Sequence, residues 1–535
     1  MYQNKNIWVG TSGEEKVVIY PKMANRHGLI AGATGTGKTV TLKVLAESFS
    51  DCGVPVFLAD AKGDLAAMCR PGVLSEALEK RLESFGLEKE AYPFKKYPTA
   101  YWDIYGEKGM PLRTTISEMG PLLLSRILDL NETQSAILTI IFKIADDEGL
   151  LLLDTKDLRA MIQYIYDHSA EYSAEYGNMA KQSLNAILRS IIALEAEGGD
   201  KFFGEPAIHI SDWLCTDNEG KGVIQILDCQ KLIHNPIMYS TFMLWMLAEL
   251  FETLPEAGDL EKPKMVFFFD EAHMLFKNAS KTLLSKIEQV VKLIRSKGVG
   301  IYFITQSPAD IPDEVLGQLG NKIQHALRAY TPKEQKGLKA AAESFRENPD
   351  FDTYEVLSQL GIGEALVSVL DEEGIPTMVK RTMILPPQSQ MGALDDEIRN
   401  SEIRNHLLYT KYSQEIDRES AYELLTGKLA KETQAAEEEK AAKEAQKQKD
   451  KEEAALKRRQ EKEEEAKRKA AEKKEAAQKK KVESTVRSVG RSATGTLGRE
   501  IGNSIGESIG GKFGKRLGGN VGASLARGLF STLFK

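Results

Sequence analysis

Gly32-Ala-Thr-Gly-Thr-Gly-Lys-Thr39 is the most informative stretch of this 535-residue chain. It satisfies the pattern G-x-x-x-x-G-K-[ST], follows the apolar run Leu29–Ala31 and opens a helix-forming stretch. In that context the glycines let backbone N–H groups surround a phosphate, and the helix N-terminus adds its positive dipole. Lys38 is then placed to reach the β- and γ-phosphates, and the Thr39 hydroxyl to bind Mg²⁺. The predicted nucleotide-binding residues are Gly32, Ala33, Thr34, Gly35, Thr36, Gly37, Lys38 and Thr39.

The segments around this loop alternate between strand and helix patterns. Short β-rich runs lie at Gly28–Ala31, Pro55–Asp60, Val223–Asp228, Met265–Asp270 and Gly300–Thr305. Helix-forming stretches, such as residues 39–50 and 281–297, separate them. Strands that alternate with helices indicate crossover units, and near-continuous apolar strands suit a sheet covered on both faces. We therefore predict an α/β fold of the P-loop NTPase type, with a mostly parallel sheet.

A long insertion separates the second of these runs from the third, at about residues 112–198. Its apolar residues recur at helical spacing, as in Leu122–Leu128 and Ala186–Leu194. We predict a helical subdomain inserted into the sheet domain, for which the pattern indicates no function.

Met265-Val-Phe-Phe-Phe-Asp-Glu-Ala-His273 is an apolar run that ends in two carboxylates. Ligands of open α/β sheets bind off the carboxyl ends of the strands, where this run and the phosphate loop both place polar residues. We expect Asp270 to hold Mg²⁺ through water and Glu271 to act as general base on the attacking water. Gln306 ends another apolar run and is expected beside the γ-phosphate, where it would sense hydrolysis. His273 shares no metal-ligand spacing with another histidine and is interpreted as structural.

The overall composition is that of a globular chain without a spanning segment. It is 42% hydrophobic and 28% charged, and no run of 18 apolar residues occurs. The first residues lack the basic-then-apolar order of a signal peptide. Four scattered cysteines (Cys52, Cys69, Cys215 and Cys229) fit reduced thiols and neither a zinc site nor a disulfide framework. These features predict a cytoplasmic protein.

The net charge of −7 combines two opposite parts of the chain. Residues 1–427 carry 44 basic and 61 acidic side chains, a charge of −17. Residues 428–481 carry +5, and residues 482–535 carry another +5. We predict an acidic ATPase body at 1–427, a charged Ala/Glu/Lys-rich spacer at 428–481, and a basic, glycine-patterned end at 482–535.

The two tail segments differ in pattern. Residues 428–481 are rich in helix formers and Glu–Lys pairs but lack sustained apolar heptads. This predicts an exposed helix or a flexible spacer, and supports a coiled-coil seam poorly. Residues 497–535 place an apolar residue at every fourth position, each followed by glycine as far as Gly522. Because such spacing lets helices approach closely, we expect this end to self-associate or to insert at a membrane surface; a disordered low-complexity tail is the alternative.

Together the motifs resemble the HerA/FtsK branch of P-loop ATPases, and most closely the bacterial family named for a HerA-helicase-like C-terminal domain. The resemblance spans about residues 24–390 and implies a RecA/FtsK-like form of the P-loop NTPase fold. The matching stretches are Arg26–Thr39, Asp60–Asp64, Phe269–His273, Arg295–Gly300, Thr305–Pro308 and Leu360–Ala365.

The resemblance implies a ring-shaped, typically hexameric homo-oligomer that hydrolyses ATP between subunits and pumps DNA. Arg295 matches the position of the arginine that stabilises charge on the phosphoryl group bound by a neighbouring subunit. Arg26 is a second candidate for nucleotide contact, and Asp60 is expected to support the site. The phosphate loop begins at residue 32, which leaves no room before it for the N-terminal β-barrel of HerA itself. Residues 1–427 also contain no dense basic cluster with interleaved aromatics, the usual pattern of a DNA-binding surface.

Two functions follow from these patterns. The first is an oligomeric, Mg²⁺-dependent ATPase that acts as a motor, with DNA as the cargo implied by the resemblance. The alternative is an ATP-dependent switch or scaffold whose tail recruits partners or a membrane surface. No N-K-x-D guanine motif stands in a suitable position, which favours ATP.

Overall fold

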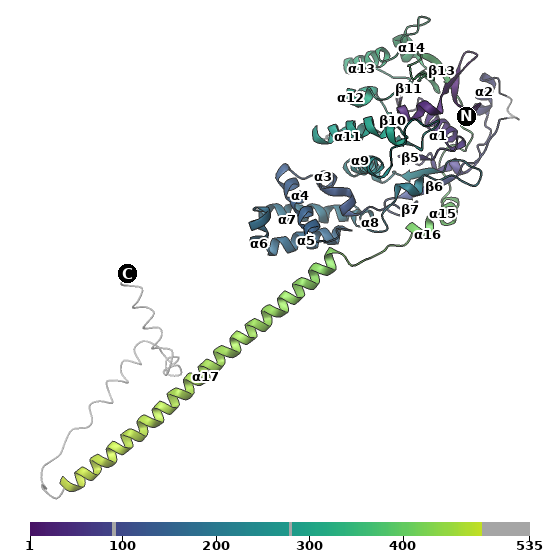
Figure 1. Cartoon of the computed structure of the whole chain (residues 1–535). Coiled ribbons are helices and arrows are strands. Elements are labelled where there is room, and N and C mark those ends of the chain that lie inside the picture. Colours follow the sequence, from purple (N-terminus) through teal and green to yellow (C-terminus); the bar gives the residue numbers. More distant parts are fainter. Residues whose placement is uncertain (88–91, 278–280, 484–535) are drawn as a thin grey trace, which may run out of the picture. The chain divides into compact units, whose positions relative to one another are not determined.

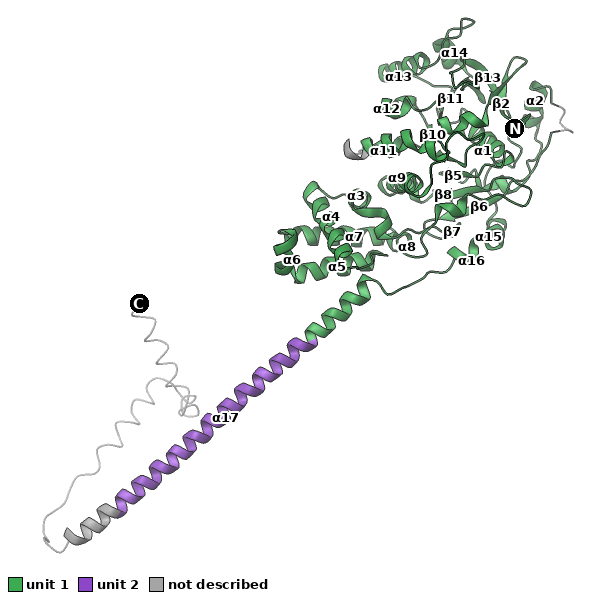
Figure 2. Ribbon diagram, in the orientation of Figure 1, with its two compact units in different colours: residues 1–433 green, residues 434–535 purple. Residues whose placement is uncertain are grey.

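The computed structural model of the chain describes residues 1–87, 92–277 and 281–483. The chain divides into two compact units, Met1–Thr433 and Gln434–Lys535 (Figure 2). The boundary falls inside helix α17 (Ala421–Glu483), and this helix contains the charged spacer predicted at 428–481. The glycine-patterned end lies, from residue 484 on, outside the described residues. Within the described ranges, no helix is long and apolar enough to cross a membrane.

A single sheet contains the thirteen strands of the described chain (Figure 1). The strands follow the order β1-β2-β13-β12-β11-β4-β10-β9-β5-β8-β6-β7, with β3 paired to β2. Their bounds are β1 Tyr2–Gln3, β2 Asn6–Ser12, β3 Glu15–Ile19, β4 Gly28–Ala31, β5 Val56–Asp60, β6 Thr99–Asp103, β7 Met110–Pro111, β8 Ile224–Asp228, β9 Met265–Phe269, β10 Val299–Thr305, β11 Asn321–His325, β12 Glu364–Ser368 and β13 Lys380–Ile384.

The strands from β11 to β7 run parallel to one another, whereas β12, β13 and the N-terminal strands extend the sheet antiparallel. Every residue of β4, β5, β9 and β10 is buried. This matches a central parallel sheet with helices on both faces, because neither face of such a strand meets water. In Figure 1, α9, α11, α12 and α13 line one side of the strands and α1 lies on the other. The predicted α/β fold with a mostly parallel sheet is confirmed.

Helices fill the connections between these strands. The bounds are α1 Lys38–Asp51, α2 Glu76–Ser84, α3 Ile116–Ile127, α4 Glu132–Asp147, α5 Thr155–Asp167, α6 Ser169–Tyr176, α7 Lys181–Ala196, α8 Gly199–Phe202, α9 Pro236–Thr253, α10 His273–Phe276, α11 Lys281–Leu293, α12 Asp313–Leu316, α13 Pro332–Glu343, α14 Thr353–Gln359, α15 Asp396–Asn405 and α16 Tyr409–Tyr412. Helices α3 to α7 occupy the stretch where the sequence predicts an inserted helical subdomain. Arg126 of α3 donates to the Ser240 hydroxyl of α9 at 3.0 Å, which connects the insertion to the sheet domain.

The strand segments that the sequence analysis did not identify lie toward both ends of the sheet. One group is β11, β12, β13 and the N-terminal strands, and the other is β6 and β7. β13 pairs with β2, so residues more than 300 positions apart in sequence share one ladder, with Met383 opposite Thr11. The stretch before the phosphate loop therefore contributes strands to the main sheet.

Candidate active site

The phosphate loop connects the carboxyl end of β4 to the first turn of α1. Gly35 and Gly37 have positive φ angles of 79° and 118°, which only glycine adopts without strain. The Thr36 hydroxyl donates to the Ala33 carbonyl at 2.7 Å. The Lys38 ammonium donates to the carbonyls of Gly32 (2.6 Å) and Ala33 (3.1 Å), so it lies folded over the loop. The arrangement predicted from residues 32–39 is present, with Thr39 on the first turn of the helix.

Neighbouring strand ends hold this loop in place. The Gly32 N–H donates to the Thr305 carbonyl of β10 (3.3 Å), and the Ala33 N–H to the Ala326 carbonyl just after β11 (2.9 Å). On the other side of the loop, the Gly363 N–H donates to the Thr36 carbonyl at 2.9 Å. The loop is thus positioned by three segments that are distant in sequence.

His325, at the end of β11, supports the same loop and was not identified from the sequence. One ring nitrogen lies 2.8 Å from the Thr41 hydroxyl and the other 2.9 Å from the Glu364 carbonyl. A Cβ on Gly32 would lie 2.5 Å from the Cβ of His325, so only glycine fits there. Burial lowers the pKa of His325 to about 4, and the ring is therefore neutral at pH 7. No local pattern around His325 marks this role.

The predicted acidic pair follows β9 directly, two strands away from β4. Asp270 accepts a hydrogen bond from the Glu271 N–H at 2.9 Å, and the buried Tyr239 hydroxyl of α9 donates to the Asp270 backbone carbonyl. Glu271 has a φ angle of 49°, an uncommon backbone state for a non-glycine residue. Burial, together with the charge of Glu271, raises the pKa of Asp270 to about 7.

Gln306 and His273 both face the Glu271 carboxylate. The Gln306 side-chain amide donates to it at 3.5 Å, and His273 Nδ1 lies 3.3 Å from the same oxygen. Lys38 lies close enough to this group to sense its charges. Burial lowers the pKa of Lys38, and the negative charges of Glu271 and Asp270 oppose that shift. The structure therefore brings together the predicted Lys38, Asp270, Glu271 and Gln306 at one edge of the sheet. Gln306 thus lies beside the predicted general base, and its place beside the γ-phosphate stays a prediction.

Thr39 and Asp270 are the residues expected to hold Mg²⁺. A hydroxyl and a carboxylate are hard oxygen ligands, and Mg²⁺ commonly binds through one or two such groups together with substrate phosphates and water. Within residues 1–87, 92–277 and 281–483, no three histidine, cysteine or carboxylate groups gather as a metal cluster. The donor set thus fits a metal held jointly with phosphate oxygens.

Asp60, expected to support the site, ends β5 next to β9. Its carboxylate accepts the N–H groups of Gly63 (2.7 Å) and Leu65 (3.1 Å), so it shapes the turn after the strand. A Cβ on Gly63 would lie 1.6 Å from the Gln230 side chain, which explains the glycine. Burial raises the pKa of Asp60 to about 6.

Arg26 and Arg295 lie at the opposite edge of the sheet from the phosphate loop. Arg26 ends the 3₁₀ helix Pro21–Arg26 before β4, and Arg295 lies in the 3₁₀ helix Ile294–Lys297 before β10. Burial and the charge of Arg295 both lower the pKa of Arg26, and Asp259 opposes this shift, so the two guanidinium groups lie within electrostatic reach of each other. Arg295 also lines a cavity of about 270 Å³ together with Asn25 and Lys292. The structure thus does not bring Arg26 to the phosphate loop of its own chain, because β4 separates the two.

A parallel sheet with a glycine-rich phosphate loop after one strand and an acidic pair after a strand two places away defines a P-loop ATPase. The chain belongs to the helicase HerA-like C-terminal family, whose profile matches residues 5–515. Membership agrees with the resemblance carried by the motifs.

Individual relatives cover different shares of the chain. A probable helicase of Methanocaldococcus jannaschii is 33% identical over 133 residues, which is 24% of this chain and 24% of that protein. The DNA double-strand break repair helicase HerA of Sulfolobus acidocaldarius is 21% identical over 392 residues, which is 70% of this chain and 67% of the relative. The chain thus spans about a quarter of the first relative and two thirds of the second.

Two solved structures are similar at low sequence identity. The plasmid coupling protein TrwB in complex with a non-hydrolysable ATP analogue has a TM-score of 0.49 and 14% identity, covering 74% of this chain and 91% of TrwB. VirB4 of Thermoanaerobacter pseudethanolicus has a TM-score of 0.46 and 15% identity, covering 72% of this chain and 97% of VirB4.

Proposed function

We propose that this P-loop ATPase hydrolyses ATP with Mg²⁺ as an oligomeric motor that moves DNA. The observation that carries the catalytic part is the convergence of Gln306 and His273 on the Glu271 carboxylate, beside Lys38. A carboxylate held between two polar side chains, next to a phosphate-binding lysine, is placed to take a proton from an attacking water. This arrangement favours an enzyme that hydrolyses the nucleotide over a chain that only binds it.

Each residue then has a defined part in the reaction. Lys38 exchanges the loop carbonyls of Gly32 and Ala33 for phosphate oxygens when ATP binds. Thr39 and Asp270 would hold Mg²⁺, which would supply charge neutralisation at the phosphates. Glu271 accepts the proton of the water, and the Gln306 amide orients either Glu271 or that water.

Replacing Lys38 by alanine, or Glu271 by glutamine, tests this assignment. Steady-state ATP hydrolysis should disappear in both purified variants. The Glu271→Gln variant should retain nucleotide binding, because its side chain keeps the same shape, whereas Lys38→Ala should bind more weakly. Wild-type turnover in either variant would refute the site.

Arg295 supports an assembly in which subunits share their active sites. It lies at the sheet edge opposite the phosphate loop, so it can serve only a nucleotide held by another chain. Its planar guanidinium suits phosphoryl oxygens, and charge stabilisation of this kind is worth orders of magnitude in rate. We propose a ring, with six subunits as in the family.

DNA as cargo rests on the similarity to HerA of Sulfolobus acidocaldarius, a DNA double-strand break repair helicase. Stimulation of ATP hydrolysis by duplex DNA, together with a mass that increases with an ATP analogue, is the expected result. A monomeric mass and DNA-independent turnover would instead favour the switch or scaffold. In that alternative the tail beyond residue 483 recruits partners or a membrane surface, and the protein works in the cytoplasm or at the periphery of a membrane.

A further inference from the structure

An exposed isoleucine lies on the turn that contacts the phosphate loop. The turn Leu360–Glu364 leads into β12, which pairs with β11. The Gly363 N–H donates to the Thr36 carbonyl at 2.9 Å, and a Cβ on Gly37 would lie 3.2 Å from the Gly363 Cα. Ile362 directly precedes this contact, yet its side chain is 80% exposed. Most aliphatic side chains of this size in the described body are buried.

Polar contacts hold the turn firmly. The Gly361 N–H donates to the Glu364 carboxylate at 2.7 Å, and Arg381 pairs with the same carboxylate at 2.9 Å. Arg81 of α2 donates to the Gly363 carbonyl at 2.5 Å. Gly363 has a φ angle of 78°, and a Cβ there would lie 2.7 Å from the Arg81 guanidinium. The exposure of Ile362 is therefore a property of a well-anchored turn.

The strand order decides what the two sides of the phosphate loop can bind. Asp270 and Glu271 follow β9, on the β10 side of β4, and in the proposed function this side would take the metal and the terminal phosphate. Ile362 lies on the β11–β12 side. A nucleotide whose phosphates are bound by the loop must extend its ribose and base away from the carboxylates. A purine ring has flat, weakly hydrated faces, and packing one face on an aliphatic side chain removes both surfaces from water.

We propose that Ile362 binds the nucleobase. One face of the base packs on the Ile362 side chain, which the Gly361–Gly363 backbone supports. The inference rests on nucleotide binding at the phosphate loop and adds the position of the base to that function. An aliphatic side chain contacts the face of the ring and does not contact the hydrogen-bonding groups at its edge. Ile362 therefore supplies affinity for the base without selecting adenine over guanine.

Binding measurements with ADP and with inorganic tripolyphosphate, both in Mg²⁺, test the proposal on the full chain. Tripolyphosphate presents the phosphates alone, whereas ADP adds the base. The Ile362→Ala variant should bind ADP about five- to tenfold more weakly, because the base would cover about half of the surface of the three carbon atoms that are lost, and should bind tripolyphosphate like wild type. Ile362→Leu should bind ADP within about twofold of wild type, since it keeps the apolar surface.

Ile192→Ala is the matched control, because Ile192 is a 46% exposed isoleucine on α7 of the insertion. It should change neither affinity. Unchanged ADP binding by Ile362→Ala, or an equal loss of tripolyphosphate binding, would overturn the proposal. Wild-type protein that binds tripolyphosphate and ADP equally well would overturn it too, whereas binding of neither ligand would overturn the ATP site itself.

Discussion

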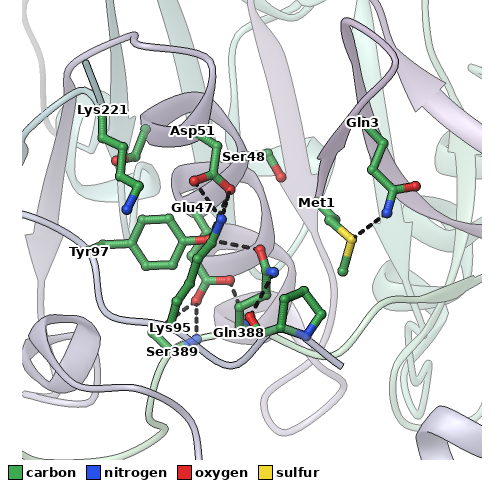
Figure 3. Close-up of polar contacts among 12 residues, drawn as sticks. Met1, Gln3, Glu47, Ser48, Asp51, Lys95, Tyr97, Lys221, Gln388 and Ser389 are labelled. Atoms are coloured by element: carbon green, nitrogen blue, oxygen red, sulfur yellow. Dashed lines mark hydrogen bonds and ion pairs between the residues drawn. The ribbon is translucent and has the colours of Figure 1, made fainter. Parts of the chain in front are cut away.

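Glu47 is a buried carboxylate in α1, and its removal tests what holds this helix in place. Its side chain is 1% exposed. It accepts hydrogen bonds from the backbone N–H groups of Gln388 (2.7 Å) and Ser389 (3.0 Å) and from the Ser389 hydroxyl (Figure 3). One turn earlier, Lys43 donates to the Gln390 carbonyl. The helix that begins with Lys38 is thereby fixed to a segment more than 300 residues away in sequence.

The expected cost follows from the groups that Glu47→Ala would leave without partners. Three donors lose a charged acceptor, and Lys43 loses the carboxylate that opposes the lowering of its pKa by burial. Leaving a buried donor without its acceptor costs about 1–3 kcal/mol, and more where the group is charged. Burial also raises the pKa of Glu47, so desolvation already offsets part of its favourable interactions. We expect the free energy of unfolding to fall by about 3 kcal/mol, less than the sum of the separate losses.

Urea unfolding of the full-length chain, followed by tryptophan fluorescence, measures this change. Glu219→Ala is the control, because Glu219 pairs with Lys221 at the surface and should leave the unfolding midpoint unchanged. A loss below about 1 kcal/mol for Glu47→Ala would refute the reasoning, since the contacts of Glu47 would then contribute no more than ordinary surface interactions.

Three further changes have defined outcomes. Because His325 is neutral in the fold, with a pKa of about 4, and protonates near pH 6.5 when unfolded, stability should fall from pH 6.5 to 4 by up to about 3 kcal/mol. That slope should shrink in His325→Gln, measured by urea unfolding at each pH, and an unchanged slope would contradict the assignment. Gly363→Ala should destabilise the fold by about 1–3 kcal/mol and weaken nucleotide binding, because a Cβ would strike the Arg81 guanidinium and φ is positive; wild-type values for both would contradict the contact. Arg295→Ala should lose ATP turnover but keep nucleotide binding. If the arginine acts between chains, mixing this variant with Glu271→Gln should restore part of the turnover. No recovery in a verified mixed oligomer would argue against shared sites.

The sequence predicted those parts of the site whose chemistry depends on residues that are adjacent in the chain. The phosphate loop needs glycines, a lysine and a threonine at fixed spacing, because backbone N–H groups and a helix start must converge on one phosphate. Asp270 and Glu271 could be placed at the same edge because parallel strands present their carboxyl ends together. The central strands were found because fully buried strands are almost wholly apolar.

The remaining features depend on pairings between distant residues. His325 contacts Thr41 across 284 positions, and its own neighbours in sequence show no functional pattern. The antiparallel strands β2 and β13 lie far apart in the chain, and their pairing with each other joins the N-terminal strands to the rest of the sheet. Arg26 precedes β4 closely in sequence, but the length of a strand separates it from the loop in space.

The sequence alone determined the class of fold, the phosphate loop and the acidic pair, because each follows from local spacing and from the burial of apolar strands. The tertiary structure decided which side chains meet: Gln306 at Glu271, His325 beneath Gly32, and Gly363 against Thr36. It also decided that Arg26 and Arg295 share the opposite edge of the sheet. The physical reason is that a β-sheet aligns strand ends by its order and register, and these depend on the whole chain at once.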